Sequence, residues 1–233
     1  GVIEILSSRR EYTKLNPCVV LLGKGDHQVT SSWIDPYGRD IQTTLGITRS
    51  NIAFVGTGKD TTTILGGFGI DNVENVTFKN MTVTNTSQNG NGICMRNAKV
   101  ELIDVALKRC NGATLYIPSS TSETTVVATR CEFANSGNGA VVRGSLTSAT
   151  FNNCVFHDNS QHGIFVSNQA TIHLHGEATA IHSNVNTGIY ANGSSKVLIH
   201  LPSHHNTIYN NTGHDRFTFG GGTITNVDEE ADN

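Results

Sequence analysis

One short segment recurs along most of the chain. Residues 151–168 read FNNCVFHDNSQHGIFVSN, and related sequences occur at residues 78–97, 127–145 and 179–193. Each copy begins with a short segment in which apolar and polar residues alternate. A turn rich in Asn, Ser and Asp follows, then a glycine and a second short alternating segment. Self-similarity at a period of 20–50 residues is typical of a solenoid. The repeat therefore predicts one elongated domain of stacked coils.

Composition decides between a helical and a β-solenoid. The 233 residues include 24 glycines, and only 15% are charged. This mixture favours strands and turns over helices, which prefer Leu, Glu, Lys and Ala. The formal net charge is −3, and no basic run is present, so we expect no nucleic-acid partner. No stretch approaches 18 apolar residues, so we expect no membrane span.

Alignment of the copies gives a register for the stacked strands. One apolar position is occupied by Val83, Leu107, Phe133, Phe156, Ile181 and Ile208. A second position holds Gly92, Thr114, Gly139, Gly163, Gly188 and Gly213. Turn residues Asn159, Asn184 and Asn211 also align, which suggests a ladder of side-chain amides along the stack. The prediction is an all-β, single-stranded parallel β-helix of about eight coils over residues 17–227.

The two ends of the chain differ from the repeat. Residues 1–16 place apolar side chains on a rough helical face, which predicts a helical cap over the first coil. Residues 30–46 are expected to form a loop outside the coil. The acidic residues 228–233 are expected to be a disordered tail. No helix is expected at the C-terminal end, which favours a protein partner or self-association there.

A resemblance to a known family appears in the first coils. Residues 47–67 read ITRSNIAFVGTGKDTTTILGG. Matching residues are Asn51, Ile52, Phe54, Val55, Gly56, Gly58, Lys59, Asp60, Thr62 and Ile64. In these residues the chain resembles the pectin-lyase-like superfamily, notably pectinesterase-like proteins. The resemblance covers residues 17–226 and implies a right-handed β-helix, in agreement with the usual hand of parallel crossovers. It does not extend to catalytic motifs: Gly213-His214-Asp215, for example, is not the Gly-His-Gly of polygalacturonases.

The register predicts an outward-facing row on one sheet, because side chains alternate across a strand. The residues that follow the inward Ile93, Leu115, Ile164 and Ile189 should point outward. Among these residues Tyr116, Phe165 and Tyr190 would form an aromatic strip suited to stacking on sugar rings. Ordinary exposed strand residues are the alternative interpretation.

Histidines and cysteines are the remaining residues that could have a catalytic or redox role. Nine of the ten histidines lie from residue 157 onward, and the register makes His157 a neighbour of His182 and His175 a neighbour of His200. His157, Asp158 and His182 are the candidate catalytic residues, although no carboxylate recurs at a fixed offset from the rings. Cys131 and Cys154 are expected to be buried reduced thiols, with a bridge as the alternative. The stacked imidazoles could bind a transition metal or act as acid–base groups, or they could be part of an ordinary polar surface. No metal ligand set and no cofactor is predicted.

Three functions remain open. The first is a non-catalytic or weakly catalytic domain whose lateral face binds a polysaccharide. The second is a carbohydrate-active enzyme, such as a lyase, a hydrolase or an epimerase. The third is a structural or protein-interaction scaffold. Fold alone does not decide among them, because function depends on the site.

Overall fold

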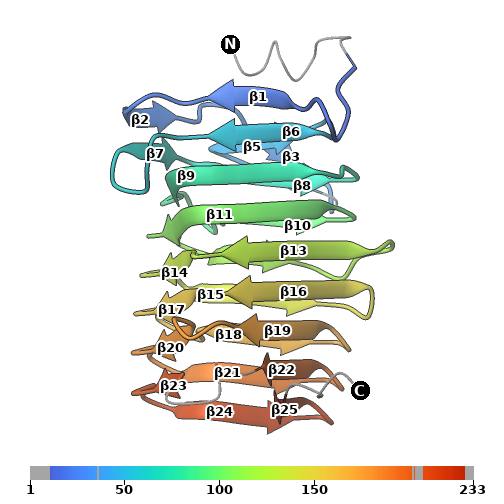
Figure 1. Cartoon of the computed structure of the whole chain (residues 1–233), viewed down its shortest axis with the longest axis vertical. Helices are drawn as coiled ribbons and strands as arrows, with labels where there is room; N and C mark the ends of the chain where they lie inside the picture. The colour runs from blue at the N-terminus through green and yellow to red at the C-terminus, as the bar shows by residue number, and fades with distance from the viewer. Residues whose placement is uncertain (1–10, 36, 201, 203–206, 229–233) are drawn as a thin grey trace.

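The computed structural model describes residues 11–35, 37–200, 202 and 207–228 (Figure 1). These residues form an all-β parallel solenoid of about seven turns, one fewer than the repeat predicted. The part of the chain that the structure describes contains no helix, and so no helix long and apolar enough to cross a membrane.

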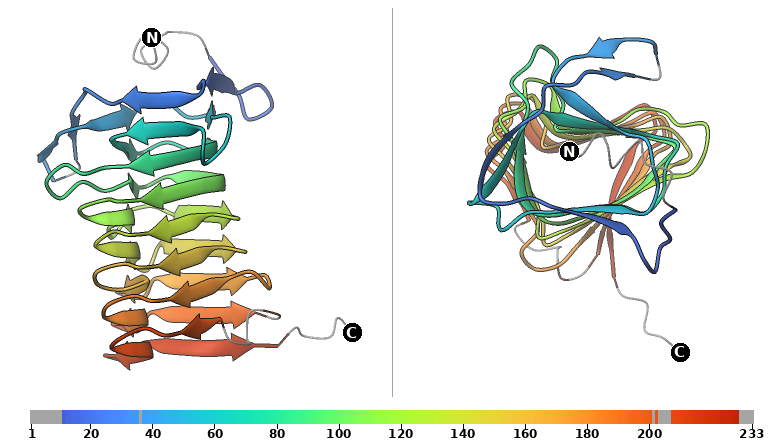
Figure 2. Two further views of the ribbon diagram at one scale, coloured as in Figure 1. Left: turned by 90° about the vertical axis from the view of Figure 1, so that its left-hand side faces the viewer. Right: turned by 90° about the horizontal axis from the view of Figure 1, so that it is seen from above.

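Three strand faces surround one core, as the view along the axis in Figure 2 shows. The first face consists of Cys18–Leu21 (β1), Ile52–Val55 (β6), Val76–Thr84 (β9), Lys99–Lys108 (β11), Thr124–Thr129 (β13), Thr147–Asn152 (β16), Thr171–His175 (β19), Lys196–His200 (β22) and Thr223–Val227 (β25).

Strands β9 and β11 bend and continue into the second face. The other strands of this face are Gly25–Gln28 (β2), Thr62–Leu65 (β7), Glu132–Ala134 (β14), Val155–His157 (β17), Ala180–His182 (β20) and Ile208–Tyr209 (β23).

The third face is a separate sheet. Its strands are Thr44–Ile47 (β5), Gly67–Asp71 (β8), Ile93–Arg96 (β10), Ala113–Ile117 (β12), Asn138–Arg143 (β15), Ile164–Ser167 (β18), Thr187–Asn192 (β21) and His214–Phe219 (β24). A short antiparallel pair, Trp33–Ile34 (β3) and Asp40–Ile41 (β4), stands outside the coil beside the first turns (Figure 2).

Single residues with left-handed backbone conformation make the corners between the first and second faces. Asn80, Asp104, Arg130 and Asn153 have φ values of 55°, 53°, 53° and 53°. Asn and Asp tolerate this region better than most residues because their short polar side chains bond locally. The Asn-rich turns of the repeat are therefore a requirement of the corner geometry.

The predicted register is confirmed for the apolar positions. Phe133 pairs with Leu107 and Phe156, and Ile181 pairs with Phe156 and Ile208. Phe133 and Phe156 are fully buried and stack with ring centroids 4.6 Å apart. Stacked apolar side chains of equivalent positions therefore form the core along the axis.

The predicted alignment of Gly213 with Gly188 was wrong by two residues. Ile189 pairs with Arg216, so Gly188 lies beside Asp215, and Gly213 lies beside Asn186. The reason is that the turn from Ile181 to Ile208 contains 27 residues, since 208 − 181 = 27, whereas the glycine spacing suggested 25.

The predicted amide ladder is present. The Asn159 Nδ2 atom donates to Asn184 Oδ1 at 2.9 Å, and the Asn184 Nδ2 atom donates to Asn211 Oδ1 at 2.8 Å. Asn159 and Asn184 are fully buried. Cys131 and Cys154 are buried free thiols, so the bridge is not formed.

The predicted terminal features are only partly within the described residues. Residues 1–10 of the expected cap and residues 229–233 of the expected tail lie outside them. Residues 11–16 form a turn, closed by an antiparallel bridge between Thr13 and Asn16, and not a helix. Leu15 is 99% exposed, so the apolar side chain expected to cover the coil points into solvent.

The last turn has polar residues at positions that are apolar in the preceding turn. Arg216, Thr218 and Asn226 pair with the fully buried Ile189, Ala191 and Ile199. Arg216 Nη1 donates to Asn226 Oδ1 at 3.2 Å. A polar terminal repeat lets a solenoid face water, so this turn covers the apolar core without a helix.

Candidate functional site

A tryptophan anchors the β3–β4 pair to the third face. A Cβ atom on Gly46 would lie 2.7 Å from the Trp33 ring, and one on Gly69 would lie 2.1 Å from it. Both distances are too short for any side chain, so these two glycines allow the indole to lie against the sheet. Asp35 is buried beside it and accepts hydrogen bonds from the backbone of Tyr37 and Arg39.

An ion pair between Asp35 and Arg39 stabilises the loop that joins β3 and β4. The Asp35 Oδ2 atom lies 2.6 Å from Arg39 Nη2, and the Arg39 side chain remains 63% exposed. Burial opposes ionisation of Asp35, but the hydrogen bonds from Arg39 and Tyr37 outweigh it and lower the pKa of the carboxyl. The loop therefore presents an oriented guanidinium at the surface, with its charge balanced by Asp35.

The loop forms one wall of a groove over the third face. The groove has a volume of about 910 Å³. It is lined by two arginines, one carboxylate and seven side-chain amides, together with small and apolar residues. The charged and aromatic lining residues are Arg39, Asp40, Tyr116 and Arg143; the amides are Gln42, Gln88, Asn89, Asn91, Asn111, Asn138 and Gln161. We call this the third-face groove.

The predicted outward row starts in the third-face groove and continues beyond it. Tyr116 pairs with Val141, Val141 with Phe165, and Phe165 with Tyr190. Phe217 follows Tyr190 in the same row. Ring centroids lie 5.2 Å apart for Phe165 and Tyr190 and 5.1 Å apart for Tyr190 and Phe217. We call Tyr116, Phe165, Tyr190 and Phe217 the aromatic column.

Arg143 links the groove to the aromatic column. Its guanidinium carbon lies 5.9 Å from the Tyr116 ring centroid and 5.3 Å from that of Phe165. Its Nε atom is buried and makes no hydrogen bond to the described residues. The planar guanidinium of Arg143 is the kind of donor group that matches a carboxylate. Burial raises the pKa of Tyr116, although Arg143 opposes the shift, so the phenol stays neutral at pH 7.

Sequence reasoning found part of this site. It named Tyr116, Phe165 and Tyr190 but not Arg143, Arg39 or Phe217. Arg143 could have been found, because it lies two residues after the outward Val141 on the same strand. Phe217 was missed because of the two-residue error at Gly213. The amide wall comes from separate turns, and no single segment of sequence contains it.

The candidate catalytic residues lie on the second face, away from the aromatic column. His157 and His182 pair in register, with ring centroids 5.3 Å apart. The His157 ring contacts two carboxylates: Asp158 Oδ2 lies 2.7 Å from Nδ1, and Glu132 Oε1 lies 3.2 Å from Nε2. Glu132 was not predicted, because it comes from the preceding turn. We call His157, Glu132, Asp158 and His182 the His157 cluster.

Hydrogen bonding changes the titration of the His157 cluster. The bond to Glu132 raises the pKa of His157 against the effect of burial, and Asp158 adds to the rise. The same bond lowers the pKa of Glu132. Burial and the neighbouring His157 lower the pKa of His182. Such an arrangement can move protons, and it can equally be a structural ion pair.

Replacement of Glu132 by Gln should therefore destabilise the fold in a pH-dependent way. The contribution of His157 is present below its unfolded pKa of about 6.5 and is lost as pH rises through its raised folded pKa. The contribution of Glu132 is present above about pH 4.3 and is lost as pH falls through its lowered folded pKa. We expect E132Q to lower the free energy of unfolding by about 1 kcal/mol near pH 5.5 and by less at pH 9.

Urea denaturation at both pH values measures this difference. Glu101→Gln, an exposed substitution on β11, is the matched control and should show little change at either pH. Equal destabilisation by E132Q at pH 5.5 and pH 9 would contradict the assigned ion pair.

A separate group of histidines could hold a metal. His173, His175 and His200 come together on the first face. Burial, followed by the neighbouring rings, lowers the pKa of His173 and His175. His204 and His205 lie outside the described residues.

The fold and the repeat define a class of protein. A family model described as right-handed beta helix region matches residues 66–229, which is more than half of the chain. The chain therefore belongs to the right-handed β-helix family. This confirms the resemblance in fold to pectin-lyase-like proteins that the first coils indicated.

No curated protein sequence matches the chain significantly. Similar solved structures include the mannuronan C-5 epimerase AlgE4 A-module of Azotobacter vinelandii, at 15% identity and a TM-score of 0.42, with 90% of this chain and 80% of that chain covered. The AlgE6 A-module of the same organism is 14% identical, with a TM-score of 0.31 and coverage of 90% and 78%. The ORF18 protein of Geobacillus virus E2 is 13% identical, with a TM-score of 0.42 and coverage of 91% and 53%, so the chain spans about half of its length. At these identities the likeness concerns the fold alone.

Proposed function

We propose that this chain is a β-helix domain that binds a polysaccharide along its third face. The observation that carries the proposal is the aromatic column, which begins inside the third-face groove and continues along the axis. A polymer with a regular repeat suits a protein surface with a regular repeat. Aromatic rings supply apolar stacking area, and the amides of the groove supply hydrogen bonds to hydroxyl groups.

Arg143 favours an acidic polysaccharide. It makes no ion pair with the described residues, and its guanidinium carbon lies 5.9 Å and 5.3 Å from the ring centroids of Tyr116 and Phe165. Arg39 adds a second guanidinium, already oriented by Asp35. A carboxylate-bearing sugar would pair with Arg143 while its ring lies against Tyr116 or Phe165.

A binding panel tests this proposal. Purified protein is incubated with neutral and acidic polysaccharides, and bound protein is measured by co-sedimentation or affinity electrophoresis. We expect acidic polymers to bind and both Y116A and Y190A to weaken that binding several-fold. Y209A is the matched control, because Tyr209 belongs to the second face. Binding that is insensitive to Y116A and Y190A, or no binding to any polymer, would overturn the proposal.

The His157 cluster supports a second candidate, a carbohydrate-active enzyme. Hydrolysis of glycosides generally uses two carboxylates, and here Glu132 and Asp158 flank one imidazole. The same panel samples are assayed for new reducing ends and unsaturated ends. Product formation that is lost in H157A, D158A and H182A would place catalysis on the second face. Products that persist in all three variants would exclude it.

The C-terminal turn bears on the third candidate, a scaffold. β24 pairs only with β21, and β25 only with β22, among the described strands. Phe219 is 63% exposed on this turn. Unpaired strand edges are templates for another chain, so a protein partner or a second copy could add a turn here. Concentration-dependent sedimentation that disappears in F219E would support this role.

A further inference from the structure

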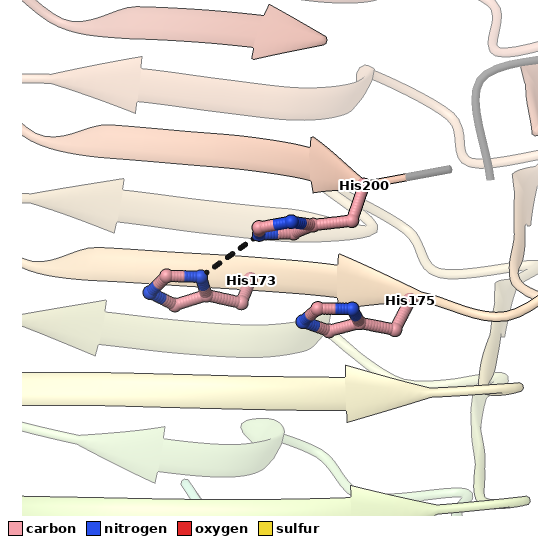
Figure 3. Close-up of side chains that lie close together, drawn as sticks. All are labelled: His173, His175 and His200. Atoms are coloured by element: carbon pink, nitrogen blue, oxygen red, sulfur yellow. Dashed lines mark hydrogen bonds between the residues drawn. The ribbon is translucent and has the colours of Figure 1, made fainter. Parts of the chain in front are cut away.

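Three imidazoles meet on the first face, as Figure 3 shows. His173 and His175 alternate outward on β19, and His200 ends the neighbouring strand β22. Leu174 pairs with Ile199, so the next residues, His175 and His200, lie side by side. Their rings stack with centroids 4.1 Å apart. We call these residues the three-histidine cluster.

The ring nitrogens of the three-histidine cluster lie close together. One nitrogen from each ring lies within 4.8 Å of the others. The closest pair, His173 Nδ1 and His200 Nε2, is 3.0 Å apart. A zinc ion bound to imidazole at about 2.0–2.1 Å in tetrahedral geometry separates its ligand nitrogens by roughly 3.4 Å. The separation of these two nitrogens is therefore within a few tenths of an ångström of the separation in a zinc site. Because the three rings are nearly parallel, metal binding requires the imidazoles to rotate until their lone pairs point at the ion.

The surroundings also suit a cation. All three residues are half-buried, and the neighbouring rings pack against one another. In the present structure one ring nitrogen donates to the other, a contact that a metal would replace by binding both.

We propose that His173, His175 and His200 form a binding site for a divalent late transition metal, with Zn²⁺ as the reference ion. Imidazole ligands select Zn²⁺, Cu²⁺ and Ni²⁺ over the hard cations Mg²⁺ and Ca²⁺, which require oxygen ligands. Three protein ligands leave at least one coordination position for water or for an oxygen of a bound molecule. The site lies on a different face from both the aromatic column and the His157 cluster, so it is independent of the proposed polysaccharide binding.

Metal titration tests the site directly. The protein is treated with a chelator and then titrated with Zn²⁺ by calorimetry and by competition with a chromophoric chelator at pH 7.5. We expect one site per chain that Mg²⁺ and Ca²⁺ do not occupy, and a rise in the melting temperature at saturation. H173A, H175A and H200A should each lower the Zn²⁺ affinity at least tenfold. H182A, which removes a stacked surface histidine from the second face, should leave the affinity unchanged.

Circular dichroism of each variant without metal separates loss of ligand from loss of fold. The proposal is overturned if the wild-type chain lacks a one-to-one Zn²⁺ site, or if folded H173A, H175A and H200A all bind as the wild type does. It is also overturned if H182A weakens binding as much as H175A, because the ion would then bind surface histidines without selection.

Discussion

Arg143→Ala is expected to lower the affinity for an acidic polysaccharide about 30-fold, with little change in thermal stability. Its guanidinium carbon lies 5.9 Å from the Tyr116 ring centroid and 5.3 Å from that of Phe165. Loss of a central interface arginine typically costs about 2 kcal/mol, which corresponds to this factor. Isothermal titration with acidic oligosaccharides measures it.

Two further variants make this prediction specific. Lys196→Ala removes one positive charge from the first face and should leave the affinity near that of the wild type. Arg143→Lys keeps the charge but loses the planar donor pair, so its affinity should be intermediate. If K196A and R143A weaken binding equally, long-range charge and not the groove accounts for the attraction.

Asn184→Ala is expected to lower the free energy of unfolding by about 3 kcal/mol. The side chain is fully buried, and its Oδ1 atom accepts from both the backbone and the side chain of Asn159. Its Nδ2 atom donates to Asn211 Oδ1. Removal therefore leaves polar groups without partners in two adjacent turns, which costs more than the loss of a single hydrogen bond.

Urea denaturation compares this variant with Asn186→Ala. Asn186 is exposed in the same turn, so its replacement should change stability by less than about 0.5 kcal/mol. Similar unfolding curves for N184A and N186A would show that the ladder contributes no net stability.

The sequence predicted the coil well because the repeat is itself the physical constraint. Phe133, Phe156 and Ile181 must occupy the same inward position for neighbouring turns to pack, so their spacing reveals the register. The Asn ladder follows for the same reason, since each amide bonds to its equivalent in the next turn. Contacts that recur in every turn can therefore be predicted from the sequence.

Features that depart from the repeat were predicted less well from the sequence. Arg216, Thr218 and Asn226 occupy inward positions in a turn that is two residues longer, and alignment by Gly213 concealed them. The loop outside the coil was predicted, and the residues around Trp33 to Asp40 were expected to wall a groove. Which residues line that groove depends on how Trp33 packs against Gly46 and Gly69. Glu132 reaches His157 across turns, a contact that no local pattern indicates.

The separation of sites is a consequence of the three-faced architecture. The aromatic column lies on the third face, the His157 cluster on the second, and the three-histidine cluster on the first. Each can be altered without contact with the others. Variants of one face therefore serve as controls for another.

The most direct test of the central claim is a crystal structure of the chain with an oligosaccharide of its tightest-binding polymer. We expect sugar rings over Tyr116 and Phe165, with a carboxylate paired to Arg143. Sugar bound instead against Glu132 and His157, or at the C-terminal turn, would contradict it.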